Sequence, residues 1–251
     1  LIAGGFASGA RGDQLLPYRE HGSRIFIYDP DSKKYNEIAS YPHTMKKPIL
    51  AKKDFESGVQ RINKICLSNT NKDVFYVSGN KLEANKNRLW RVKLSDSSEV
   101  KWKNLTTDLN SKTSFSPWQV WQPIRAIASG YSVSEEIWLG YGNGYSSMDH
   151  KVMYHKNAMD ETGGEWVKIN QGLPDFPINH LELDPVSHYL YAATDVGVYI
   201  NRNPRNASSS WECFSKGLPV VKVTDLEIEA ESGEIFISTF GRGLFKANLL
   251  R

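Results

Sequence analysis

Polar residues that could bind a ligand recur inside four short apolar segments of the chain. The segments share apolar first and fourth positions and span residues 62–65, 124–127, 178–181 and 223–226. Alternation of this kind is typical of short strands, and we expect the polar residues to occupy equivalent inner-strand positions. Together they would form a small ring of mixed charge, which suits a polar ligand or merely lines a channel filled with water. The residues are Lys64, Arg125, His180 and Asp225.

Two aspartates are weak candidates for catalysis. Hydrolysis of a glycosidic bond needs two carboxyl groups facing one cleft, about 5–10 Å apart. Asp225 opens an inner segment and Asp195 follows an apolar run, so both could approach a common centre. An aspartate at a turn is, however, more often a cap for backbone N–H groups. A sialidase would need an arginine triad, and no Phe-Arg-Ile-Pro motif surrounds Arg125. We therefore assign no catalytic residue.

Aromatic residues in two polar stretches are candidates for binding a glycan or a protein partner. Trp118 and Trp121 lie in a stretch with Ser and Pro, and Tyr145 follows an Asn-Gly step. Such rings can stack on sugars, and they anchor many protein interfaces. Packing between sheets would explain the tryptophans equally well, and Asn-Gly is also an ordinary hairpin turn.

Composition limits the class of protein. The 251 residues are 40% hydrophobic, 12% aromatic and 24% charged, which is typical of a folded globular chain. The formal net charge is only +3 and no long basic block occurs, so we expect no nucleic-acid partner. No apolar run approaches the roughly 20 residues that span a membrane, so we expect no membrane span.

The cysteines do not suggest a disulfide scaffold or a metal centre. Cys66 and Cys213 lie far apart, and neither has a nearby Cys or His with the spacing of zinc ligands. We expect two unpaired, buried thiols, no metal and no cofactor.

The apolar segments belong to a longer repeat of about 45–60 residues. Each unit continues with an apolar-aromatic run ending in small residues, a turn and a third strand, and three of the four units add a fourth strand that opens with Trp. Four short strands in each unit are the signature of a β-propeller blade. The sequence therefore predicts an all-β fold, a β-propeller of four-stranded antiparallel blades. We expect one segment over 1–251 with five blades, roughly 1–48, 58–109, 121–174, 178–219 and 221–250.

The first and last predicted blades are incomplete. The first lacks an inner strand and the last lacks its Trp strand, and neither end supplies what the other needs. Open sheet edges are usually avoided by closing the ring. We therefore expect this segment to be part of a larger propeller.

One turn carries a recognisable pattern of structural residues. Asp160 is followed by Gly163, Gly164 and Trp166. The carboxylate would accept bonds from turn N–H groups, the glycines would permit positive φ, and the Trp would wedge between blades. Arg242, between two glycines, would clamp neighbouring carbonyl groups, with anion binding as the alternative.

That turn resembles an Asp-box. The last 75 or so residues resemble the C-terminal part of Asp-box (BNR-like) propellers of the sialidase, xyloglucanase and sortilin-type group. The matching stretches are 172–174, 178–183, 193–199 and 238–245. Similar segments occur in secreted surface proteins of Bacteroidetes-type bacteria. The resemblance therefore implies an extracellular or cell-surface location, with the periplasm as the alternative.

The incomplete blades and the missing catalytic constellation favour a non-enzymatic interaction or scaffold module. We expect it to bind a protein partner or to complete a ring with a missing N-terminal propeller segment. Two alternatives stay open. One is the C-terminal half of a xyloglucanase-like glycoside hydrolase, and the other is a carbohydrate-binding propeller.

Overall fold

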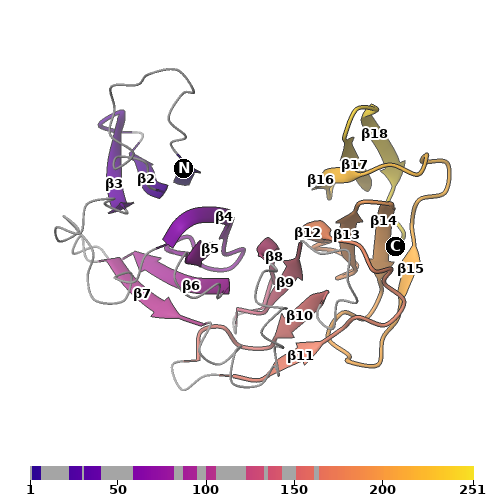
Figure 1. The fold of residues 1–251 in the computed structure, drawn as a ribbon, viewed down its shortest axis with the longest axis horizontal. Helices are drawn as coiled ribbons and strands as arrows, with labels where there is room; N and C mark the ends of the chain where they lie inside the picture. The colour runs from indigo at the N-terminus through magenta and orange to yellow at the C-terminus, as the bar shows by residue number, and fades with distance from the viewer. Residues whose placement is uncertain are drawn as a thin grey trace.

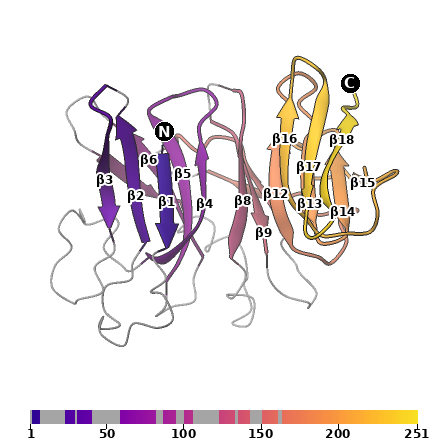
Figure 2. The same cartoon turned by 90° about the horizontal axis from the view of Figure 1, so that it is seen from above.

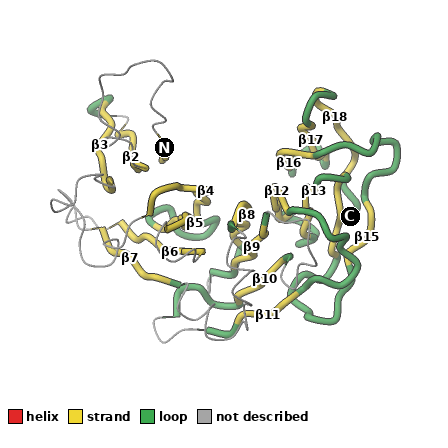
Figure 3. Tube along the Cα trace, in the orientation of Figure 1, coloured by secondary structure: helices red, strands yellow, loops and turns green. Residues whose placement is uncertain are grey.

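The computed structural model describes most of the chain as strands joined by turns and loops. The described residues are 2–6, 23–29, 31–40, 59–81, 87–94, 100–105, 123–132, 135–142, 151–160 and 164–251. Figure 3 shows that these residues contain strands and loops but no helix. Within them there is accordingly no helix of the length and apolar character needed to cross a membrane.

The described strands form five antiparallel sheets of three, four, four, four and three strands, each in chain order. This confirms the predicted all-β fold with four-stranded antiparallel blades. The three-stranded sheets are β1 (Ile2–Phe6), β2 (Ser23–Asp29), β3 (Lys34–Ser40), and β16 (Val223–Glu229), β17 (Glu234–Thr239), β18 (Gly243–Asn248). The four-stranded sheets are β4 (Val59–Leu67), β5 (Val74–Lys81), β6 (Asn87–Leu94), β7 (Val100–Asn104); β8 (Ile124–Ser129), β9 (Ile137–Tyr141), β10 (Val152–His155), β11 (Trp166–Lys168); and β12 (Ile178–Leu183), β13 (Leu190–Thr194), β14 (Gly197–Asn201), β15 (Trp211–Cys213).

The sheets follow one another along an arc. Figure 1 shows the first strands β4, β8, β12 and β16 on the inner side of the arc and the fourth strands β7, β11 and β15 on its outer side. Viewed from above, the sheets stand beside one another with their strands roughly parallel to a common direction (Figure 2). Each sheet therefore turns one face toward the preceding sheet and the other toward the next.

Burial on both faces explains why the middle strands are apolar almost throughout. In β13, Tyr191 and Ala193 pack toward the last sheet, whereas Leu190 and Ala192 pack toward the preceding one. Side chains alternate in direction along a strand, so a strand covered on both sides needs apolar residues at successive positions. All five residues of β13 are buried.

The Trp of each described four-stranded sheet's outer strand packs against the preceding sheet, although β7 begins at Val100, two residues before Trp102. Trp102, Trp166 and Trp211 each belong to an apolar cluster that includes side chains of the sheet before. The indole Nε1 of Trp211 also donates a hydrogen bond to the carbonyl oxygen of Ile169 at 2.6 Å. These rings therefore wedge between sheets, as the sequence predicts.

Buried charges fasten neighbouring sheets. Arg205, after β14, donates two hydrogen bonds to the Glu136 carboxylate at 2.8 and 2.7 Å, and Tyr154 donates a third at 2.8 Å. Burial alone would raise the pKa of Glu136, but the bonds from Arg205 and Tyr154 outweigh it and lower that pKa. The carboxylate is thus held ionised at the boundary between the third and fourth sheets.

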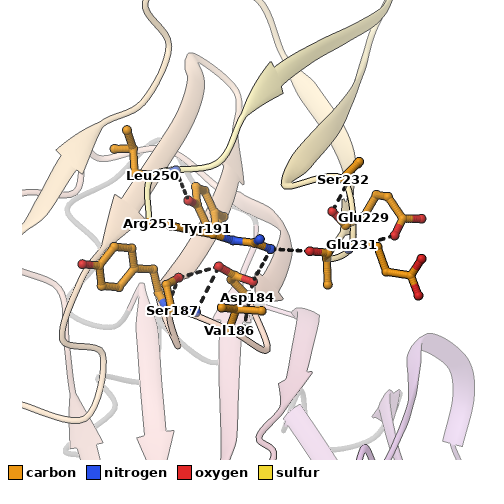
Figure 4. Close-up of polar contacts among 11 residues, drawn as sticks. Asp184, Val186, Ser187, Tyr191, Glu229, Glu231, Ser232, Leu250 and Arg251 are labelled. Carbon is orange, nitrogen blue, oxygen red and sulfur yellow. Dashed lines mark hydrogen bonds and ion pairs between the residues drawn. The ribbon is translucent and has the colours of Figure 1, made fainter.

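A similar tie joins the fourth sheet to the last. Arg251 lies with Nη2 3.6 Å from the buried carboxylate of Asp184 and donates to the carbonyl oxygen of Ala230 at 2.7 Å (Figure 4). Asp184 also accepts a hydrogen bond from the Ser187 hydroxyl, and the Leu250 backbone N–H donates to the Tyr191 hydroxyl at 3.4 Å. The last sheet is therefore anchored by polar as well as apolar contacts.

Candidate functional site

The inner strands share a β-bulge near their start. The register shifts once between the first and third residue of each predicted apolar segment, in β4, β8, β12 and β16. A bulge leaves one residue unpaired and turns the side chains beyond it. The first paired residues after the bulges are Lys64, Ala126, His180 and Asp225.

Arg125 does not share this position. It lies one residue earlier, at the bulge of β8, where β12 has Asn179. Its side chain runs over Gly142, where an added Cβ would overlap the Arg125 Cδ atom. The expected equivalence with His180 is therefore wrong for Arg125, because Arg125 is the second residue of its apolar segment, whereas Lys64, His180 and Asp225 are the third residues of theirs.

Three of the predicted residues meet around the His180 ring. His180 Nδ1 lies 2.6 Å from Asp225 Oδ1 and 3.2 Å from Lys64 Nζ. Its Nε2 lies 3.2 Å from Glu182 Oε2 on the same strand. Lys64 comes from the second sheet, so its contact with His180 reaches across to the fourth sheet. We call these four residues, Lys64, His180, Glu182 and Asp225, the histidine cluster.

Hydrogen bonding sets the charges of the histidine cluster. Burial would lower the pKa of His180, but its bonds to Asp225 and Glu182 outweigh burial and raise that pKa. The bond from His180 is the largest influence on Asp225 and lowers the pKa of its carboxyl group. A protonated imidazole donates from both nitrogens, which matches a carboxylate on each side. Side-chain exposure is 11% for His180 and 62% for Asp225, so a buried base presents an accessible carboxylate.

Asp195 belongs to a second polar group beside the histidine cluster. Its Oδ1 accepts a hydrogen bond from Asn179 Nδ2 at 2.8 Å and lies 3.2 Å from Lys222 Nζ. The Asn179 amide also donates to the carbonyl oxygen of Val223 at 2.9 Å. These contacts tie the start of β12 to the start of β16, so Asp195 acts here as a structural acceptor.

Asp225 does not have the raised pKa expected of a general acid in glycoside hydrolysis. A general acid must hold a proton near neutral pH, which requires a raised pKa. Asp225 shows the opposite direction, and Asp195 is engaged by Asn179 and Lys222. In the described part of the chain, no group of three or more His, Cys, Asp or Glu residues is arranged to hold a metal ion.

The Asp160 turn is described in part. Trp166 is buried, and its ring meets His155 edge-on with 4.6 Å between centroids. An added Cβ at Gly164 would overlap the His155 ring, so the turn requires a glycine there because of close packing. Asp160 itself is partly buried, and its N–H donates to the carbonyl oxygen of Asn157 at 3.3 Å. Gly163 lies outside the described residues.

Other sequence-predicted residues fall elsewhere. Trp118, Trp121 and Tyr145 lie outside the described residues. Arg242 is exposed, and no described residue bonds to its side chain, which does not support the expected carbonyl clamp. Cys66 and Cys213 are unpaired as expected. Neither is fully buried as expected, however: Cys66 is partly buried, and Cys213 is exposed because it lies on the outermost strand of its sheet.

Sequence reasoning missed Glu182 and Glu136. Glu182 lies two residues after His180 on the same strand, so the period of two would have placed both side chains on one face. Glu136 precedes an apolar strand, and nothing local in the sequence indicates its partner Arg205, 69 residues later.

The comparisons with known proteins identify the fold. No protein-family profile matches the chain, and no curated protein matches it. Its fold resembles a COPII outer-coat vertex chain on membranes, with TM-score 0.57 and 11% identity over 90% of this chain and 52% of that one. It also resembles PorZ, a surface component of the type-IX secretion system of Porphyromonas gingivalis, with TM-score 0.56 and 12% identity over 91% of this chain and 30% of that one. A xyloglucanase from Xanthomonas campestris gives TM-score 0.54 and 12% identity over 90% of this chain and 33% of that one.

The chain spans between 30% and 52% of the lengths of these three proteins. Likeness at such low identity concerns the fold and carries no activity with it. With the antiparallel sheets arranged along an arc, it establishes that the chain has the β-propeller fold.

Proposed function

We propose that this chain is a non-enzymatic interaction module that binds a protein partner at its last sheet and completes a propeller ring with it. The observation that carries the proposal is the state of that sheet. Among the described strands, β18 pairs on one side only, with β17, whereas the equivalent strands β6, β10 and β14 each pair with a fourth strand. An unpaired edge is a template for another polypeptide.

Exposed apolar side chains also support a binding surface at the last sheet. Val220, Phe240 and Leu244 are 86%, 75% and 66% exposed. The Phe240 N–H donates to the carbonyl oxygen of Lys222, and Leu244 pairs with Ser238, so all three lie around one end of the last sheet. Apolar groups gathered in this way mark interaction sites more often than scattered ones do.

An extracytoplasmic setting is part of the proposal. PorZ is described as a bacterial surface component, and the Asp160 turn resembles an Asp-box. Both suggest a secreted or surface-attached propeller, and the exposed Cys213 is compatible with labelling from outside the cell. Protection of the protein from added protease until the cytoplasmic membrane is broken would contradict this setting.

The test of the proposed function is the native mass of the protein purified from the cells that make it. We expect a complex of this chain with another polypeptide. Phe240→Ser should weaken the complex, whereas Leu67→Ser, at a side chain that is 54% exposed on β4, should leave it intact. A free monomer under all extraction conditions would contradict the proposal.

Binding of a polar ligand is a second candidate function, favoured by the histidine cluster. The exposed Asp225 carboxylate is fixed by a buried imidazole, which gives a rigid polar anchor. A panel of small amines and monosaccharides, screened by thermal shift with wild type and Asp225→Asn, tests this candidate. A glycan could also bind through Trp118, Trp121 and Tyr145, and loss of glycan-array binding in Trp118→Ala with Trp121→Ala would support that assignment.

A further inference from the structure

Three sheets turn a common pattern of side chains toward the sheet that follows. The second strand supplies a large aromatic residue and, two positions later, a small one, and the third strand supplies an aliphatic residue paired with the small one. All are buried beneath the next sheet. The aromatic positions are Tyr76, Trp138 and Tyr191, the small ones are Ser78, Gly140 and Ala193, and the aliphatic ones are Leu89, Val152 and Val198.

The last sheet repeats this pattern on its outward face. Phe236 occupies the aromatic position, Ser238 the small position and Leu244 the aliphatic position, with Ser238 and Leu244 paired. Ile237 and Phe245 point the other way, into the cluster shared with the fourth sheet. The outward face therefore has the side chains of a covered face, yet Leu244 is 66% exposed. We call Phe236, Ser238, Leu244 and Lys246 the outward face.

The positive charge of Lys246 does not prevent another sheet from covering the outward face. Lys246 pairs with Phe236 in register, as Arg91 pairs with Tyr76. Arg91 is only 5% exposed, and it donates to the carbonyl oxygen of Ala158 in the next sheet at 2.8 Å. A basic side chain at this position can thus be buried when the next sheet offers a carbonyl group.

The contacts between consecutive sheets of this chain indicate which side chains a sheet covering the outward face would carry. Each following sheet places two aliphatic residues, three positions apart on its first strand, against the sheet before. These pairs are Ile62 and Ile65, Ile124 and Ile127, Ile178 and Leu181, and Val223 and Leu226. All four pairs are already packed against a sheet of this chain. In a second copy of the chain, these strands therefore could not cover the outward face.

We infer that the outward face docks a β-sheet of a different polypeptide, whose first strand carries Ile or Val and, three residues later, Ile or Leu, and lies beside β16 and β17. This inference rests on the proposed function and specifies the partner surface. The partner strand would pack beside β16 in the same way that β16 packs beside β12. Lys246 donates to Glu234 Oε1 at 2.7 Å, and its ammonium group has further N–H bonds that a carbonyl group of the partner could accept.

The experiment is photo-cross-linking of the full chain in the cells that make it. A photoreactive residue replaces Leu244 in one sample and, as a control, Val186, which is 58% exposed on the β12–β13 turn. We expect position 244 to attach to a different polypeptide, and mass spectrometry to map the attachment to a strand with the stated motif. Attachment to a segment without that motif, or to a second copy of this chain, would overturn the inference.

Affinity measurements separate this inference from the proposed function. Leu244→Asp should weaken binding of the identified partner by about tenfold or more, since a buried interface anchor is lost. Val186→Asp should not change it, and the exposure of both side chains leaves folding unaffected. A partner that binds Leu244→Asp normally but fails to bind Phe240→Ser would sink the inference and keep the proposed function. If no partner binds wild type, both fail.

Discussion

His180 Nδ1 lies 2.6 Å from Asp225 Oδ1 and joins the first strands of the two neighbouring sheets β12–β15 and β16–β18. The same nitrogen lies 3.2 Å from Lys64 Nζ, which comes from the second sheet. A protonated Nδ1 can only donate, and Asp225 is the acceptor within reach. A neutral ring with a bare Nδ1 can instead accept from Lys64. Whether Nδ1 carries a hydrogen therefore decides whether the ring donates to Asp225 in the last sheet or can accept from Lys64 in the second sheet.

Stability should depend on pH through His180. Its pKa is raised in the folded protein from the ordinary value of 6.5. The stabilisation is therefore complete below about pH 6.5 and is lost as the pH rises through the raised value. We expect His180→Gln to lower the free energy of unfolding by about 1–3 kcal/mol at pH 6 and by less at pH 9. Urea denaturation across this range measures it, and a difference that does not vary with pH would contradict the assignment.

Arg205→Met should destabilise the fold markedly. The substitution leaves the Glu136 carboxylate, whose side chain is 8% exposed, without its two bonds from Arg205. We expect a loss of about 1–3 kcal/mol in the free energy of unfolding. Arg202→Met is the matched control, because its pair with Glu212 is exposed on both sides and should contribute under about 0.5 kcal/mol. Equal losses in the two variants would refute a special role for the buried carboxylate.

Two buried tryptophans should respond differently to the same change. Trp211→Phe removes the bond from Nε1 to the carbonyl oxygen of Ile169 and leaves that oxygen unsatisfied. Trp166 Nε1 has no partner among the described residues, so Trp166→Phe loses ring volume only. We expect Trp211→Phe to be more destabilising by about 1–2 kcal/mol, as measured by chemical denaturation. The reverse order would show that packing outweighs the hydrogen bond.

The two thiols should differ in reactivity. Burial raises the pKa of the Cys66 thiol to about 12, so little thiolate forms near neutral pH. Cys213 is exposed. We expect iodoacetamide at pH 8 to label Cys213 in the native protein and Cys66 only after denaturation, as read by peptide mass spectrometry. Rapid native labelling of Cys66 would mean that the β4 region opens readily.

The sequence predicts the strands well because their determinants are local. Alternation of apolar residues and the Trp that opens each fourth strand report burial on two faces directly, so the order of strands agrees with the structure. The meeting of Lys64, His180 and Asp225 also follows from the repeat, since equivalent positions of a repeat meet around one axis. Arg125 was misplaced because it is the second residue of its apolar segment, and the residue equivalent to His180 is Ala126. The contact between Glu136 and Arg205 depends on the path of a loop that belongs to another sheet. The residues around Glu136 in the sequence do not indicate that path.

The apolar clusters have a consequence for how the protein loses its structure. Each cluster is shared by two consecutive sheets, and in the described residues none of the four reaches a third. Each sheet is then stabilised mainly by the sheets directly beside it, as in a linear array of coupled units. Unfolding starts most easily at the first and last described sheets, which have one such neighbour each. The contact between Lys64 and His180 departs from this rule, because it skips the third sheet. It gives the second and fourth sheets a direct polar contact, which the apolar clusters between consecutive sheets do not provide.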